Sequence, residues 1–81
     1  MLATFRARRR HHRLMSVATH LVVEAQVRLN VEPEQVTYEQ VAALAFGLYR
    51  YRVQEREAAD HLAAALIAHG HGIGHLPAVP D

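Results

Sequence analysis

The sequence predicts an all-α fold, in the form of a two-helix antiparallel hairpin with a basic N-terminal arm and an extended C-terminal tail. Apolar residues recur every three or four positions along two long segments, a proline-containing break separates them, and the end of the chain is rich in glycine and proline. With 81 residues and no cysteine, the chain has room for one small domain without disulfide bonds. The predicted segments are a basic arm (1–13), a first helix (14–30), a break (31–36), a second helix (37–69) and an extended tail (70–81).

An apolar stripe predicts the first helix. Its members follow the i, i+3, i+4, i+7 spacing of one helix face, and they are Leu14, Val17, Ala18, Leu21, Val22, Ala25 and Leu29. A second pattern competes with it, because apolar and polar residues alternate over residues 23–31 as they would in a strand. A single strand would need a partner strand from another subunit. The alternative fold is therefore a ribbon-helix-helix-like dimer with a strand at 23–31.

A start signal, a long stripe and a stop signal predict the second helix. Pro33 ends the preceding structure, and Thr37 followed by Gln40 fits a capping box, in which each side chain binds the other residue's backbone N–H. The apolar stripe continues to His69, and Gly70 is the residue type that commonly follows a helix end. Because the connection between the helices is short, we expect them to pack as antiparallel neighbours.

Charge is distributed unevenly along the chain. Residues 1–30 contain six arginines and one glutamate, whereas residues 31–81 contain three arginines and seven acidic residues. The run from Arg8 to Arg13 is a dense cationic cluster, and blocks of like charge are typical of interaction segments. We therefore expect the arm to bind a partner. Its arginine-rich, acid-poor composition is also typical of an organellar presequence.

The hydropathy pattern limits the location and the partners of the chain. No apolar run approaches the roughly 18–20 residues that span a membrane. His20 and Glu24 interrupt the apolar stretch after the arm, which argues against a secretory signal and predicts an intracellular protein. The expected partners are other protein subunits or a second copy of the chain. Nucleic acid and peripheral contact with an anionic membrane are the alternatives for the arm.

The residue types argue against catalysis and for a docking role. The chain has no cysteine nucleophile, no glycine-rich phosphate loop after a strand and no H-E-x-x-H motif, so we expect no enzyme activity and no cofactor. Both apolar stripes are wider than one helix–helix seam requires, which is typical of a protein interface. We expect a non-catalytic accessory or structural subunit that docks into a larger macromolecular assembly through its basic arm and an apolar helical face. The candidate partner-binding residues are Arg6, Arg8, Arg9, Arg10, Arg13, Phe46, Tyr49 and Tyr51.

The alternative function is a small dimeric DNA-binding regulator, for which two geometries are open. In a helix-turn-helix, the spacing of Ala43, Gly47 and Val53 would place the turn at the glycine. In the ribbon-helix-helix arrangement, alternate residues of the strand would read the major groove. The candidate DNA-binding residues are Gln26, Arg28, Asn30, Arg50 and Arg52.

Three histidines near the C-terminus form the only metal-ligand pattern in the sequence. His69, His71 and His75 could hold a metal that prefers nitrogen ligands. The glycines between them leave this segment flexible, and no nearby carboxylate would orient an imidazole. We therefore predict no metal site and keep these histidines as a weak alternative.

Overall fold

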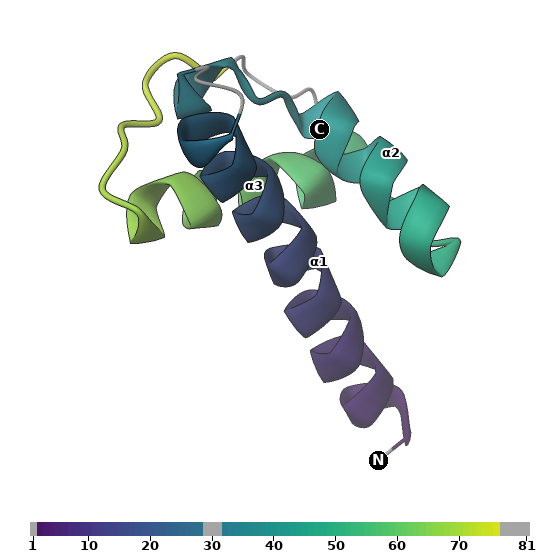
Figure 1. The fold of residues 1–81 in the computed structure, drawn as a ribbon. Helices are drawn as coiled ribbons and strands as arrows, with labels where there is room; N and C mark the ends of the chain where they lie inside the picture. The colour runs from purple at the N-terminus through teal and green to yellow at the C-terminus, as the bar shows by residue number, and fades with distance from the viewer. Residues whose placement is uncertain (1, 29–31, 77–81) are drawn as a thin grey trace.

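The computed structural model describes residues 2–28 and 32–76, which form three α-helices and one short 3-10 helix. Helix α1 spans Leu2–Val27, η1 spans Pro33–Gln35, α2 spans Tyr38–Tyr49 and α3 spans Glu55–Ala68. Figure 1 shows α2 returning beside α1 and α3 crossing behind α1. The described residues contain no strand, so the predicted all-α class is confirmed.

The hydrophobic core lies where the three α-helices meet. Leu14, Leu62 and Leu66 are among its largest fully buried side chains, each contributing about 1.5–3 kcal/mol relative to an exposed position. Alanines on α3 occupy little space, which lets α3 approach the other two helices closely. The buried residues are Leu14, Val17, Ala18, Val22 and Ala25 of α1, Val36, Val41 and Ala45 in and before α2, and Ala58, Leu62, Ala65 and Leu66 of α3.

The predicted single helix over residues 37–69 is wrong, because the chain turns at residues 50–54 and forms two helices. Arg50 has a φ of 58° in the left-handed region, and its N–H donates to the Phe46 carbonyl, which ends α2. Gln54 is extended, and the acidic Glu55 and Glu57 favour the start of α3. An unbroken helix would measure about 50 Å and meet α1 along one seam. The turn instead lets α3 bury its apolar face against both α1 and α2.

The N-terminal segment also differs from its prediction. The arm expected over residues 1–13 and the helix expected from residue 14 form one continuous helix that begins at Leu2. The strand alternative at 23–31 is wrong over residues 23–28, which are helical up to Val27 and then turn. Residues 29–31, the end of that alternative, lie outside the described part of the chain.

The predicted signals at the start of α2 and the end of α3 correspond to observed contacts. The capping box is confirmed, because Thr37 Oγ1 accepts from the Gln40 N–H at 3.3 Å and Gln40 Oε1 accepts from the Thr37 N–H at 3.0 Å. Gly70 adopts a φ of 79° after α3, a conformation that glycine adopts without strain. The tail beyond it is not fully extended, because it turns at residues 74–75 and packs Leu76 against the core. Residues 77–81 of the predicted tail lie outside the described residues.

Candidate partner-binding surface

The first two turns of α1 extend beyond the rest of the molecule. Every side chain of residues 2–9 is exposed, and Figure 1 shows this end of α1 reaching away from α2 and α3. Leu2 is 71% exposed and Phe5 is 56% exposed, so apolar as well as charged groups face solvent here. The exposed cations of these turns are Arg6, Arg8 and Arg9. We call residues 2–9 the projecting arm.

Arg10, the next residue of the cationic run, is half-buried and binds α3. Its Nε and Nη2 atoms donate to the two carboxylate oxygens of Glu57 at 2.9 and 2.8 Å, and Nη2 also donates to the Arg52 carbonyl at 3.0 Å. The guanidinium lies 4.8 Å from the centre of the Tyr51 ring. The hydrogen bond from Arg10 lowers the pKa of Glu57 below its ordinary value, although partial burial opposes this shift. The same hydrogen bond raises the pKa of Arg10.

Arg13 makes a second internal contact, with two tyrosines. Its guanidinium lies 4.8 Å from the centre of the Tyr49 ring, and its Nη1 atom donates to the Tyr51 hydroxyl at 3.1 Å. The two tyrosine rings are 5.3 Å apart. Arg10 and Arg13 therefore bind the loop between α2 and α3 to the side of α1. Of the residues predicted to bind a partner, these four are brought together and contact one another.

A histidine pair completes this junction. His11 Nδ1 lies 2.9 Å from His61 Nε2, and His61 Nδ1 lies 2.7 Å from the Glu57 carbonyl oxygen. A carbonyl oxygen only accepts hydrogen bonds, so His61 donates to the Glu57 carbonyl through Nδ1, and its other ring nitrogen, Nε2, faces His11 Nδ1. Sequence reasoning missed this pair because its members are 50 positions apart and neither position carries a local signal.

The folded chain gathers its arginines at one end. Arg50 and Arg52 are exposed in the loop that Arg10 and Arg13 hold against α1, and Arg56 follows in the first turn of α3. All nine arginines are in the described part of the chain, and Arg28 alone lies at the far end of α1, about 28 Å along the helix axis from Arg9. The sequence pattern had placed Arg50, Arg52 and Arg56 in an acidic half. In the fold, the loop that carries Arg50 and Arg52 lies beside Arg10 and Arg13, the residues that follow the projecting arm.

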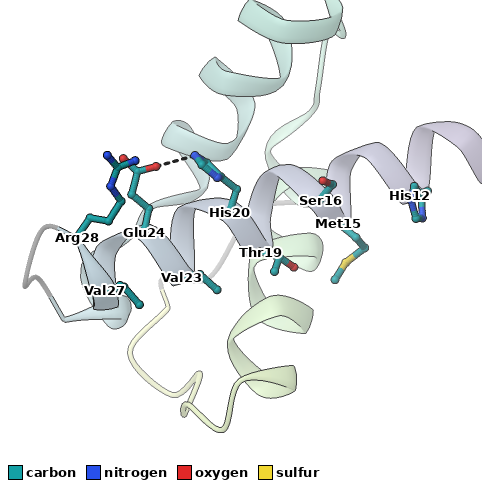
Figure 2. Close-up of a pocket in the computed structure, with 9 residues that line it drawn as sticks. All are labelled: His12, Met15, Ser16, Thr19, His20, Val23, Glu24, Val27 and Arg28. Atoms are coloured by element: carbon teal, nitrogen blue, oxygen red, sulfur yellow. Dashed lines mark ion pairs between the residues drawn. The ribbon is translucent and has the colours of Figure 1, made fainter.

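The outer face of α1 is a second exposed surface, and it is partly apolar. A hollow of about 660 Å³ lies along it. Figure 2 shows that His20 and Glu24, joined by a 2.6 Å ion pair, line one edge, while Val23 and Val27 point to the other. Its lining residues come from α1 and from Arg28 directly after it, so this is an open helix face and not an enclosed site. The lining residues are His12, Met15, Ser16, Thr19, His20, Val23, Glu24, Val27 and Arg28.

A smaller groove of about 350 Å³ continues from this face toward α2. It contains Leu44 and the exposed Leu48 beside Ser16 and His20. Phe46, another predicted partner-binding residue, is also exposed, and the Arg50 guanidinium covers its ring at 5.4 Å.

The structure does not assemble the histidine metal site. His69 and His75 are exposed, whereas His71 is partly buried, with Nδ1 at 3.5 Å from a carboxylate oxygen of Glu34. The His71 Nε2 atom is buried without a hydrogen-bond partner. Within residues 2–28 and 32–76, no group of three histidine or acidic side chains is placed to hold a metal ion.

The two predicted DNA-binding geometries are not observed. Gly47 lies inside α2, so the helix-turn-helix turn predicted at this residue is wrong. The actual turn leads into a helix whose first turn carries the exposed Glu55, which would repel DNA phosphates. Gln26 is helical and Arg28 follows α1 in a turn, both far from Arg50 and Arg52, and Asn30 lies outside the described residues.

Comparisons with known proteins give no relative for this chain. No protein-family model, no curated protein and no solved structure matches it. None of the helices in the described part of the chain is long and apolar enough to cross a membrane. The case for a function therefore depends on the two exposed surfaces.

Proposed function

We propose that this protein is a non-catalytic accessory or structural subunit that docks into a larger macromolecular assembly. The observation that carries this proposal is the projecting arm, which presents Arg6, Arg8 and Arg9 on two helical turns that no other element covers. These turns continue α1, but their exposed side chains add no tertiary packing to it. We therefore assign the exposed arginines of these turns to the binding of an anionic partner.

The apolar outer face of α1 supplies the second contact of this proposal. Val27 is 73% exposed and Leu48 is 59% exposed, and both border the hollow or the groove next to it. Exposed apolar groups beside a groove are typical of protein interfaces. The arm and this face lie on one continuous helix, so a single partner assembly can engage both.

The internal pairing of Arg10 with Glu57 supports a role without catalysis. Glu57 is the acidic group with a lowered pKa, and both of its oxygens are bound by Arg10. A carboxylate held in this way is neither an available base nor an acid near neutral pH. Its contribution is to fix the loop between α2 and α3.

Charge reversal on the arm tests the proposal. The tagged full chain, expressed at native abundance, is expected to sediment in a complex much larger than one chain. The variant Arg8→Glu/Arg9→Glu should sediment at the size of the free protein, whereas the control Ala64→Glu/Ala68→Glu, at two exposed positions of α3 outside both surfaces, should stay in the complex. Circular dichroism verifies that both variants keep the wild-type helix content. Unchanged sedimentation of Arg8→Glu/Arg9→Glu contradicts a docking role for the arm.

A complementary variant tests the apolar face. Val23→Glu/Val27→Glu adds two charges to the outer face of α1 without touching the core, since both side chains are exposed. We expect it to weaken the same complex. A complex that tolerates this change and the arm reversal together rules out both surfaces.

A further inference from the structure

We infer that the projecting arm enters the major groove of duplex DNA, and that the loop between α2 and α3 contacts the phosphates at the edge of that groove. This inference rests on the proposed docking function, because it names the partner of the same arm. The residues that carry it are Arg6, Arg8 and Arg9 of the arm, together with Arg50 and Arg52 of the loop.

The directions of the arm arginines favour a partner with anionic groups on two sides. Helical positions two apart point about 160° away from each other, so Arg6 and Arg8 extend from nearly opposite sides of α1, and Arg9 lies between them. A flat membrane or a flat acidic protein surface would meet only one of these sides. The walls of a DNA groove carry phosphates on both.

The dimensions of the arm match a major groove. An α-helix with its side chains is about 10–12 Å across, and the major groove of B-form DNA is about 12 Å wide and about 8.5 Å deep. Residues 2–9 extend for about 12 Å along the helix axis, which is enough to reach the groove floor. Leu2 and Phe5 are exposed on the arm and offer apolar contacts for thymine methyl groups.

The loop arginines lie where the groove edge would be. Arg10 binds the Arg52 carbonyl and stacks on Tyr51, so the loop lies beside α1 directly after the arm. Arg50 and Arg52 are exposed on this loop. When the arm is in the groove, these side chains face the sugar–phosphate backbone, and such contacts fix the position of a protein on its DNA.

Neighbouring acidic groups determine which helix makes the contact. The negative charge of Glu57 is balanced by its bidentate ion pair with the Arg10 guanidinium. Glu55 and Asp60 remain exposed on α3 and would repel phosphate. The element that approaches DNA is therefore α1, in contrast to a helix-turn-helix, where the second helix of the pair enters the groove.

Fluorescence anisotropy with the full chain tests this inference, using a short DNA duplex and an RNA duplex of the same sequence. Neutralising five phosphates, three by the arm and two by the loop, gives a slope of about −4.5 in log affinity against log salt, or about 500-fold weaker binding at about 200 mM than at about 50 mM salt. The RNA duplex should bind about tenfold more weakly or worse, because its major groove is too deep and narrow for a helix.

Matched variants locate the contact. Arg6→Gln/Arg8→Gln/Arg9→Gln should reduce the magnitude of the salt slope by about 2.7 and Arg50→Gln/Arg52→Gln by about 1.8, because each lost phosphate contact removes about 0.9. Arg28→Gln removes the same charge at the far end of α1 and should leave binding unchanged. Circular dichroism verifies that the exposed substitutions keep the fold.

Three outcomes would overturn the inference. Equal affinity for DNA and RNA duplexes would show attraction to any polyanion, without groove entry. Tighter binding to polyglutamate or to phosphatidylserine vesicles would identify an acidic protein or a membrane as the partner. Absence of DNA binding, together with an arm-dependent complex in the sedimentation experiment, would overturn the DNA assignment and leave the docking function standing.

Discussion

Arg10 in α1 and Glu57 in α3, 47 positions apart, form an ion pair in which both carboxylate oxygens accept hydrogen bonds from one guanidinium. This contact divides the cationic run of the N-terminus into two groups. Arg10 and Arg13 fasten the loop between α2 and α3, whereas Arg6, Arg8 and Arg9 remain exposed on the projecting arm. Stability measurements therefore test the role of Arg10 and Arg13 in the fold, and binding measurements test the role of the arm arginines.

The ion pair should contribute measurably to stability. Each side chain in the pair is 32% exposed. Because the hydrogen bonding is bidentate, we expect the pair to contribute about 1 kcal/mol to the free energy of unfolding, more than an ordinary surface pair. A double-mutant cycle of Arg10→Gln and Glu57→Gln in urea denaturation should give a coupling free energy of this size. Glu55→Gln, a neighbouring change in the same turn, is the control and should change stability by less than about 0.5 kcal/mol. A coupling free energy near zero would contradict the contact.

Stability should fall in acid partly through Glu57. Its pKa in the folded protein is lowered from the ordinary value of 4.5, chiefly by the hydrogen bond from Arg10. The unfolded chain therefore takes up the proton more readily, and the contribution of this group is fully present above pH 4.5 and lost as the pH falls through the folded value. The free energy of unfolding of Glu57→Gln should show a smaller loss than wild type below pH 4.5. Parallel curves for the two proteins would show that Glu57 is not the group involved.

The core of α3 should be sensitive to truncation. Leu62 is fully buried among α1, α2 and α3, so Leu62→Ala should cost about 2–5 kcal/mol. Leu48→Ala removes the same atoms from a side chain that is 59% exposed and should cost less than about 1 kcal/mol. Thermal unfolding followed by circular dichroism compares the two. Equal losses would place Leu62 outside the core.

Two positions in and before α2 should change stability in opposite directions. Thr37→Ala removes one half of the capping box and should destabilise by about 1 kcal/mol. Gly47→Ala should stabilise by up to about 1 kcal/mol, because Gly47 is inside the helix and an added Cβ would meet nothing within 4 Å. Urea denaturation measures both. Destabilisation by Gly47→Ala would indicate that the glycine has a conformational role.

Several elements of the fold could be predicted from local sequence signals. The stripe of α1 and the capping box of Thr37 and Gln40 each depend on residues within one or two helical turns. The turn at residues 50–54 escaped prediction because it contains neither glycine nor proline, and Arg50 adopts the left-handed conformation that glycine or asparagine usually supplies. The polar run from Gln54 to Glu57 was the only sequence signal of this turn, and the same run is equally typical of the exposed face of one long helix.

The candidate partner-binding surface also combines features that local sequence predicts with features that depend on tertiary contacts. The sequence by itself determined that the chain is helical and that its N-terminal end is cationic, since periodicity and charge are properties of neighbouring residues. Only the tertiary structure decided that Arg10 and Arg13 are engaged, that His11 meets His61, and that the loop carrying Arg50 and Arg52 lies beside Arg10 and Arg13. These contacts join positions about 40 to 50 apart, and they depend on the angle at which α3 crosses α1. That angle is set by the packing of alanine and leucine side chains in a shared core, which no local pattern specifies.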